Sequence, residues 1–226
     1  MSAPDAHSHE PAEPTRRPMA FRHQRWARAL AQRLGAAGVT PSAVSLTSIA
    51  FSLLAAAALV ISARLPAGAA AVLLVAAPVL VALRGICNLI DGMIAVEGGR
   101  RTASGEVFND FPDRVSDVAL FVAAGYAAHD ATWGVPLGWL AAVLAVATAY
   151  TRMLGGALGA RQPFCGPMAK PARMAVLSAA SVAATAERLL VGTSWSLVGG
   201  LGLIVLGCMV TVARRLARIV RELEHR

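Results

Sequence analysis

The sequence has little charge and few cysteines. Only 15% of its 226 residues are charged and 56% are hydrophobic, which is too apolar for an ordinary soluble domain. The cysteines Cys87, Cys165 and Cys208 are odd in number and form no CxxC pair, which argues against a disulfide framework and favours a reducing or membrane location. No soluble stretch is long enough for a DNA-binding domain. The net charge of +8 therefore indicates contact with anionic membrane lipids and no nucleic acid polymer as partner.

Lysine is nearly absent as well. Lys170 is the single lysine among 21 basic residues, and with so much alanine and glycine this composition is typical of a GC-rich bacterial genome. The first apolar run begins about forty residues into the chain, so we expect no signal peptide. Residues 1–20 are polar and lack periodicity, which predicts a disordered tail.

Long apolar runs dominate the rest of the chain. They cover roughly 41–62, 68–96, 106–128, 135–157, 171–192 and 196–216. A helix needs about 20 residues to cross about 30 Å of hydrocarbon, and continuous Ala/Leu-rich runs favour helices over a β-barrel. We expect an all-α integral membrane protein with six transmembrane helices in a domain spanning 36–222.

A basic amphipathic segment precedes the first apolar run. Residues 21–35 alternate apolar side chains such as Trp26 with arginines such as Arg28, which predicts a helix lying in the membrane interface. Thr40 and Pro41 then suit the N-cap and the first helical position of the first span.

The distribution of basic residues orients the spans. The N-terminal segment, Arg100, Arg101, Arg161, Lys170, Arg173 and the C-terminal segment carry the basic residues of one side, and the opposite loops hold only Arg64 and Arg188. Trp133, Trp139 and Trp195 lie near that opposite face, as an aromatic belt requires. We therefore expect a multi-pass protein of the bacterial inner membrane, with both termini and the charged stretch described next on the cytoplasmic side.

The stretch 87–117 concentrates charge between the second and third apolar runs. It holds six acidic residues, two asparagines and three arginines. At about 1.5 Å per helical residue, Asn88 and Asp91 on one helix and Asn109 and Asp113 on the next lie about 6–12 Å below the connecting loop. Helical spacing also puts each pair on one stripe, so the two pairs face each other at one depth.

Three interpretations of this stretch follow from the residues alone. An Asp/Asn cluster suits a hard cation such as Mg²⁺ or Mn²⁺ together with a substrate phosphate. A structural network would instead have Arg84 and Arg114 neutralise Asp91 and Asp113. An ion or proton pathway is the third, although a transporter is expected to place charge near mid-membrane in several spans.

The spacing of this stretch resembles the CDP-alcohol phosphotransferase family. That family has the pattern D-x-x-D-G-x-x-A-R-x8-G-x-x-x-D-x-x-x-D, and this chain reads N-x-x-D-G-x-x-A-V from Asn88, then eight residues, then G-x-x-x-N-x-x-x-D ending at Asp113. The interfacial segment, the entry GVTPSAVSLTS and the six runs are also similar to the family. The resemblance covers most of the chain after residue 20.

The resemblance implies transfer of a phosphatidyl or related group from CDP-diacylglycerol or another CDP-alcohol to an alcohol acceptor, with release of CMP, and it suggests the family's homodimer. Carried over by position, the metal ligands for Mg²⁺ or Mn²⁺ are Asn88, Asp91, Asn109 and Asp113, with Asp113 as the catalytic base. The donor would lie beside Gly92, Ala95 and Gly105, with Arg84 and Arg101 as candidates to replace the family's arginine.

The chain departs from the family pattern at three positions. Asn88 and Asn109 stand where the family has aspartates, and Val96 stands where it has arginine. A divergent bacterial branch that carries these asparagines also has an arginine four residues before the first, as Arg84 is here. Loss of two carboxylates favours a single metal, and it leaves a catalytically silent CDP-lipid binder or a scaffold as the alternative function.

Four cations mark a second candidate region on the same side. Arg152 ends the fourth span, and Arg161, Lys170 and Arg173 follow in the next loop and helix start. They are candidates for binding an acceptor phosphate. The competing interpretation is that they only hold the loop on the cytoplasmic side.

Overall fold

The computed structural model describes residues 25–97 and 105–225, with side chains at all of these except 95–97, 105, 106, 108 and 109. Within these residues the regular elements are all helices. They are α1 (Arg25–Ala36), α2 (Pro41–Ser62), α3 (Ala67–Glu97), α4 (Gly105–Ala127), α5 (Gly134–Ala157), α6 (Lys170–Leu190) and α7 (Trp195–Glu224). The predicted tail, 1–20, and the start of the predicted interfacial segment lie outside the described residues.

Local sequence signals account for where α2 begins. Thr40 has an extended backbone, and its Oγ1 accepts a hydrogen bond from the backbone N–H of Ala43 at 3.2 Å. Pro41 occupies the first helical position, where its missing N–H costs nothing. The predicted cap is confirmed, and it fixes the register of every residue that follows in α2.

Within the described residues, four helices are long and apolar enough to cross a membrane. They are α2, α3 over residues 67–94, α5 and α7. The other two of the six predicted spans correspond to α4 and α6, which have 23 and 21 residues and are less apolar because acidic, basic and hydroxyl side chains interrupt them. A helical membrane protein is thus supported, and the full count of six spans stays a prediction.

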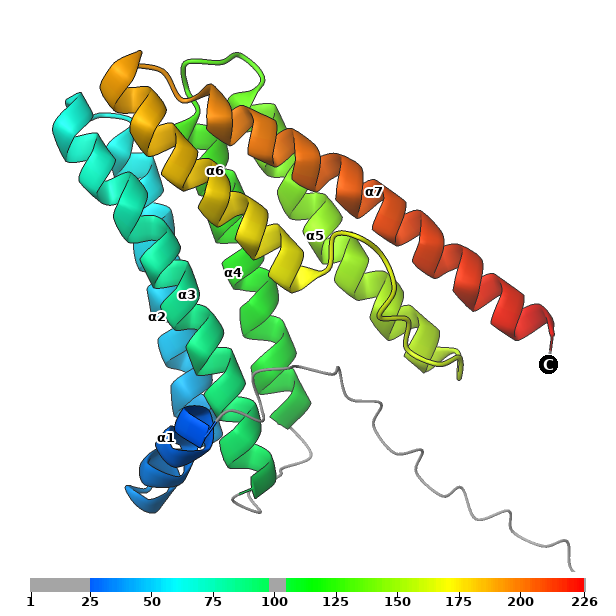
Figure 1. Cartoon of the computed structure of the whole chain (residues 1–226). Coiled ribbons are helices and arrows are strands. Elements are labelled where there is room, and N and C mark those ends of the chain that lie inside the picture. The colour runs from blue at the N-terminus through cyan, green and yellow to red at the C-terminus, as the bar shows by residue number, and fades with distance from the viewer. Residues whose placement is uncertain (1–24, 98–104, 226) are drawn as a thin grey trace, which may run out of the picture.

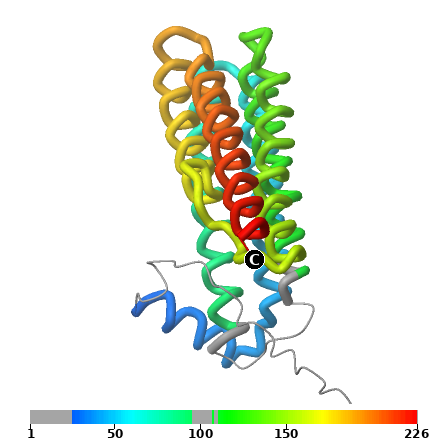
Figure 2. Tube along the Cα trace, turned by 90° about the vertical axis from the view of Figure 1, so that its right-hand side faces the viewer, coloured from blue at the N-terminus to red at the C-terminus, as the bar shows by residue number. Residues whose placement is uncertain are grey.

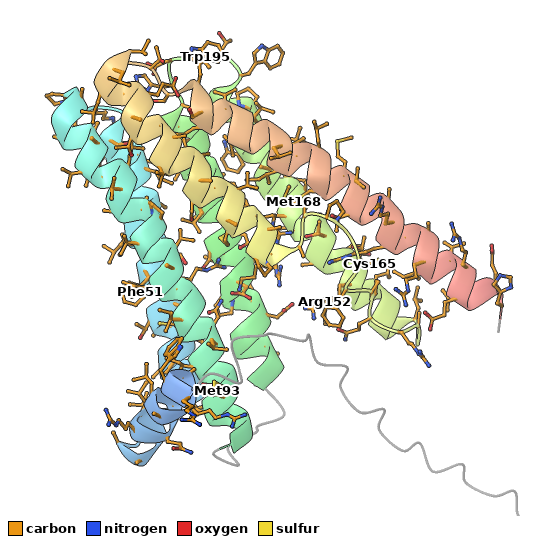
Figure 3. The ribbon with its side chains drawn as sticks, viewed as in Figure 1. Phe51, Met93, Arg152, Cys165, Met168 and Trp195 are labelled. Carbon is orange, nitrogen blue, oxygen red and sulfur yellow. The ribbon has the colours of Figure 1, made fainter. Side chains whose placement is uncertain are left out.

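The helices form one bundle. In Figure 2, α2 to α7 run along a common axis and α1 crosses at one end. We call this the α1 end; it also holds the C-terminus (Figure 1). The opposite end is called the Trp195 end, after the residue labelled there in Figure 3. Toward the α1 end, α3 and α4 diverge from α5 and α7, and the first residues of α6 lie between these two pairs (Figure 1).

Close backbone contact joins α4 and α5 toward the Trp195 end. A Cβ on Gly125 would lie 3.0 Å from Gly138 Cα, and a Cβ on Gly138 would lie 2.7 Å from the carbonyl oxygen of Phe121. Glycine is therefore required for these helices to touch. The two helices are fastened at this end and separate toward the other.

Polar contacts also close the Trp195 end. Glu187 of α6 accepts hydrogen bonds from the backbone N–H groups of Trp195 at 2.6 Å and Ser196 at 2.8 Å, which are the first residues of α7. Arg188 donates to Asp130 at 3.1 Å. These bonds tie the turn between α6 and α7 to the one between α4 and α5.

At the α1 end, α1 packs against the last part of α3. Ala27 and Ala31 of α1 form a small apolar cluster with residues of α3 that include Leu89 and Met93. Met93 is labelled beside α1 in Figure 3. The same part of α3 carries Asn88 and the acidic residue Asp91, so α1 supports the candidate site from behind.

Candidate functional site

The polar face of α3 meets the polar face of α4, as the spacing predicted. Asn88 Nδ2 of α3 donates a hydrogen bond to Asp113 Oδ1 of α4 at 2.8 Å. Arg84, one turn before Asn88, donates to the same oxygen at 3.3 Å. The helix periodicity of the sequence thus gives the correct faces for both helices.

Asp113 holds the centre of these contacts. Lys170, the first residue of α6, forms an ion pair with Asp113 Oδ1. Every side-chain contact that the described residues make to this carboxylate ends on Oδ1. Asp113 is 8% exposed, so the group is buried but reachable.

A second carboxylate lies one turn deeper, between two arginines. Asp117 is fully buried, and its Oδ1 accepts from Arg84 at 3.0 Å and its Oδ2 from Arg173 at 2.8 Å. Arg84 and Arg173 are 1% and 2% exposed. Because both oxygens are bonded to cations, Asp117 is the centre of a buried ion triad that joins α3, α4 and α6.

Arg173 continues this polar network toward α5. It donates to Thr148 Oγ1 at 2.8 Å and to the Met168 carbonyl at 3.2 Å. Arg215 of α7 donates to the Thr148 and Cys165 carbonyls. Buried polar bonds therefore connect the α3–α4 face with α5, α6 and α7.

Asp91 has a different environment. Its Oδ2 accepts a hydrogen bond from Ser45 Oγ of α2 at 2.7 Å. Its Oδ1 is buried and has no hydrogen-bond partner among the described residues. The side chain is only 3% exposed, so one oxygen of a buried carboxylate is left for a further group.

Three of the four candidate acceptor cations lie against acidic residues of α4. Arg152, labelled in Figure 3, pairs with Asp110 at 2.7 Å and lies 5.8 Å from the Phe164 ring centre. Together with the pairs of Lys170 and Arg173, this makes three cations facing three carboxylates that are spaced along one side of α4. Arg161 is exposed, and its backbone N–H donates to Glu222 of α7 at 2.8 Å.

The charges of this region nearly cancel. The carboxylates are Asp91, Asp110, Asp113 and Asp117. The cations that form ion pairs with these carboxylates are Arg84, Arg114, Arg152, Lys170 and Arg173. Among the described side chains, one positive charge remains in excess. A region with this charge balance favours a cation that enters together with an anion.

The remaining predicted donor residues are only partly described. Gly92 is half-buried in α3. Ala95, Gly105 and Asn109 have a helical backbone, with Asn109 one turn before Asp113 in α4. Arg101, the last of them, lies outside the described residues.

Oxygen donors of this region fit a hard cation in chemical type. Among the described residues, no three His, Cys, Asp or Glu side chains converge on one point. The unpartnered Asp91 Oδ1, the amide oxygen of Asn88 and the carboxylate of Asp113 are nevertheless ligands that Mg²⁺ and Mn²⁺ accept.

Sequence reasoning missed Ser45 as a partner of the site. Buried serines recur at 45, 48 and 52 in α2, and this spacing was the available signal that α2 turns a polar stripe inward. It missed Thr148 and Arg215 as well, for which the sequence gives no comparable pattern.

Solved structures share this fold. The chain is similar to phosphatidylinositol phosphate synthase of Mycobacterium tuberculosis with CDP-DAG bound, at a TM-score of 0.71 and 22% identity over 87% of this chain and 94% of that one. The same enzyme in complex with manganese and citrate gives a TM-score of 0.70 and 21% identity over 85% and 88% of the two chains. No protein-family model and no curated protein matches the chain. At this identity the likeness establishes a common fold.

Proposed function

We propose that the chain transfers a phosphatidyl group from CDP-diacylglycerol, or a related group from another CDP-alcohol, to an alcohol and releases CMP. The observation that carries this proposal is the agreement between the motif spacing and the fold. The motif-like spacing from Asn88 to Asp113 falls on facing stripes of α3 and α4, and the fold around it is similar to that of an enzyme solved with CDP-DAG bound. We place this site on the cytoplasmic side of the bacterial inner membrane.

We assign the metal to oxygen atoms of α3 and α4. Asn88, Asp91, Asn109 and Asp113 would hold Mg²⁺ or Mn²⁺, and the similar enzyme has been solved with manganese. Bound there, the cation would screen the charge of the donor diphosphate. The free Oδ1 of Asp91 supports the assignment of this residue as the principal ligand.

Asp113 is the proposed base. Arg84, Asn88 and Lys170 all contact Oδ1, which leaves Oδ2 to accept the proton of the acceptor hydroxyl. The three donors fix the carboxylate plane, so that this oxygen is held in one orientation. The acceptor oxygen would then attack the phosphorus that carries the lipid group, and the bond to CMP would break.

The donor would lie along Gly92, Ala95 and Gly105, where small residues permit close approach. Arg84 is buried and bonded to two carboxylates. We therefore assign it the role of orienting Asp113 toward the donor. Arg101 remains the candidate for direct contact with the diphosphate.

The acceptor carries a phosphate or another anionic group in this proposal. The candidate cations are Arg152, Arg161, Lys170 and Arg173, which are more than a neutral alcohol requires. Because Arg173 is 2% exposed and bonded to Asp117, its part would be to hold α6 in place. Lys170 is best placed among them because it contacts the base itself and is 21% exposed in its side chain. A compact ammonium on a flexible stem can move between Asp113 and an incoming phosphate.

Two observations favour a second function, that of a silent CDP-lipid binder or scaffold. Both positions at which the family has a further carboxylate hold asparagine, and Asp113 is bonded to two cations. Such a protein would bind CDP-diacylglycerol without turnover.

A single assay separates the two functions. Purified protein is incubated with CDP-diacylglycerol, Mg²⁺ and a panel of phosphorylated and neutral alcohols, and CMP release is measured. CMP release that depends on one acceptor and is lost in Asp113→Asn supports the transferase. If the protein binds the donor but releases CMP with none of the acceptors, the result supports the silent binder and contradicts the transferase.

A further inference from the structure

The hydroxyl of Ser45 makes a contact of a kind that the other hydroxyls of α2 do not make. Ser48 donates to the Ser45 carbonyl at 2.7 Å and Ser52 to the Ser48 carbonyl at 2.9 Å, both within their own helix. Ser45 donates across to Asp91 of α3 at 2.7 Å. Of the hydroxyl bonds of α2 in the described part of the chain, only this one joins two helices.

The bond leaves Asp91 half satisfied. Oδ2 accepts from Ser45, while Oδ1 is buried with no partner among the described residues. A buried acceptor without a hydrogen bond destabilises the folded protein, and more so when the acceptor is charged. A serine present only to satisfy this carboxylate would do so incompletely. If Ser45 holds Oδ2 so that Oδ1 faces a cation, both the bonded and the unbonded oxygen of Asp91 have a role.

The position of Ser45 is itself fixed. It lies in the second turn of α2, just after the cap formed by Thr40 and Pro41. Ser45 is 5% exposed, and its carbonyl is bonded by Ser48. Its hydroxyl is therefore held at one depth and in one direction relative to α3.

We infer that Ser45 is a positioning residue that orients Asp91 for a divalent cation. This inference rests on the proposed function and deepens it, because it adds α2 to a metal site so far assigned to α3 and α4. Hydrogen bonds to a metal-binding carboxylate typically change metal affinity by about 10- to 100-fold. Ser45 does not touch the reacting atoms and acts only through Asp91.

Mn²⁺ binding to the purified full chain in detergent tests this inference. Free Mn²⁺ is measured by electron paramagnetic resonance, with and without saturating CDP-diacylglycerol. We expect Ser45→Ala to raise the Mn²⁺ dissociation constant about 10- to 100-fold. Ser45→Thr, which keeps the hydroxyl, should stay closer to the wild type than to Ser45→Ala.

Ser52→Ala is the matched control, since Ser52 is a buried serine of the same helix whose hydroxyl bonds only to its own helix. It should leave the dissociation constant within about twofold. Equal Mn²⁺ affinities for Ser45→Ala and Ser52→Ala would overturn the inference. The inference would also be overturned if Asp91→Asn bound Mn²⁺ as tightly as the wild type. It would be overturned as well if the wild type bound no Mn²⁺ in the presence of CDP-diacylglycerol.

Parallel measurement of CMP release keeps this inference separate from the proposed function. The expected order of Mn²⁺ affinities in a protein that releases no CMP would support the role of Ser45 and contradict catalysis. CMP release together with equal Mn²⁺ affinities of Ser45→Ala and Ser52→Ala would support catalysis and contradict the role of Ser45.

Discussion

Replacing Asp117 with asparagine removes the one charge that lies between two buried arginines. The carboxylate is fully buried and accepts from Arg84 at 3.0 Å and Arg173 at 2.8 Å. At an effective dielectric constant of about 20, each pair attracts by about 6 kcal/mol before desolvation is subtracted. Desolvation offsets much of this attraction, but loss of one partner from a buried ion pair still typically costs about 3–5 kcal/mol.

The contacts that remain in Asp117→Asn indicate where in this range of unfolding free energy the loss falls. Arg84 keeps Asp113 at 3.3 Å as a counter-ion. Arg173 loses the only carboxylate that it pairs with in the described structure and keeps neutral acceptors, Thr148 Oγ1 and the Met168 carbonyl. The cost therefore comes mainly from Arg173, and we expect about 3 kcal/mol, which is about a 100-fold change in the unfolding equilibrium.

Unfolding in mixed detergent and SDS micelles, followed by tryptophan fluorescence, measures this change. Asp110→Asn is the matched control on the same helix, because its carboxylate is 36% exposed and its two ion pairs lie near the surface. It should cost no more than about 1 kcal/mol. The double variant Asp117→Asn/Arg173→Met removes both charges and should recover most of the loss. A loss below about 1 kcal/mol in Asp117→Asn would refute the argument.

Three further predictions concern the proposed reaction. Asp113→Asn should abolish CMP release in the acceptor assay while Mn²⁺ affinity stays within about tenfold, because Asp91 remains the principal ligand; full activity would remove the base assignment. Mn²⁺ should bind weakly alone and more tightly with CDP-diacylglycerol, since the donor supplies the missing negative charge, and Asn88→Asp should strengthen binding of the metal alone. Titrations with and without donor that give one affinity would contradict this. Lys170→Gln should raise the apparent KM for a phosphorylated acceptor about tenfold, as expected for loss of one charge-assisted contact, and leave that for CDP-diacylglycerol nearly unchanged. Transfer to neutral alcohols alone would show that the acceptor assignment is wrong.

Much of the fold could be predicted because apolar composition and cap residues indicate where membrane helices lie and begin. The first apolar run, 41–62, coincides with α2, and its cap residues Thr40 and Pro41 act as expected. The last apolar run ends near 216, whereas α7 continues to Glu224. Hydropathy falls where arginines begin, whereas backbone hydrogen bonding continues into the basic segment, so apolarity marks the membrane part of a helix rather than its end.

Individual contacts of the site could be predicted only within one hairpin, although the sequence also placed Arg152, Lys170 and Arg173 on the same side. The contact of Asn88 with Asp113 follows from helical periodicity and the short connection between α3 and α4. The bonds from Ser45 to Asp91 and from Arg173 to Asp117 join residues 46 and 56 positions apart. They depend on how α2 and α6 are rotated about their axes. An apolar helix surrounded by lipid and by other helices carries little sequence signal for that rotation.

The asparagine at position 88 acquires a physical reason from these contacts. Its amide donates to Asp113 at 2.8 Å, which a carboxylate at this position could not do, and two carboxylates at that distance would repel each other unless a cation lay between them. Arg84, one turn away, reaches Asp113 and Asp117 together. The pair Arg84 and Asn88 therefore joins α3 to α4 through protein groups alone, where the family pattern would place opposing aspartates. A site assembled in this way keeps its shape through protein groups, and in the proposed reaction the incoming diphosphate would supply the charge that holds the metal.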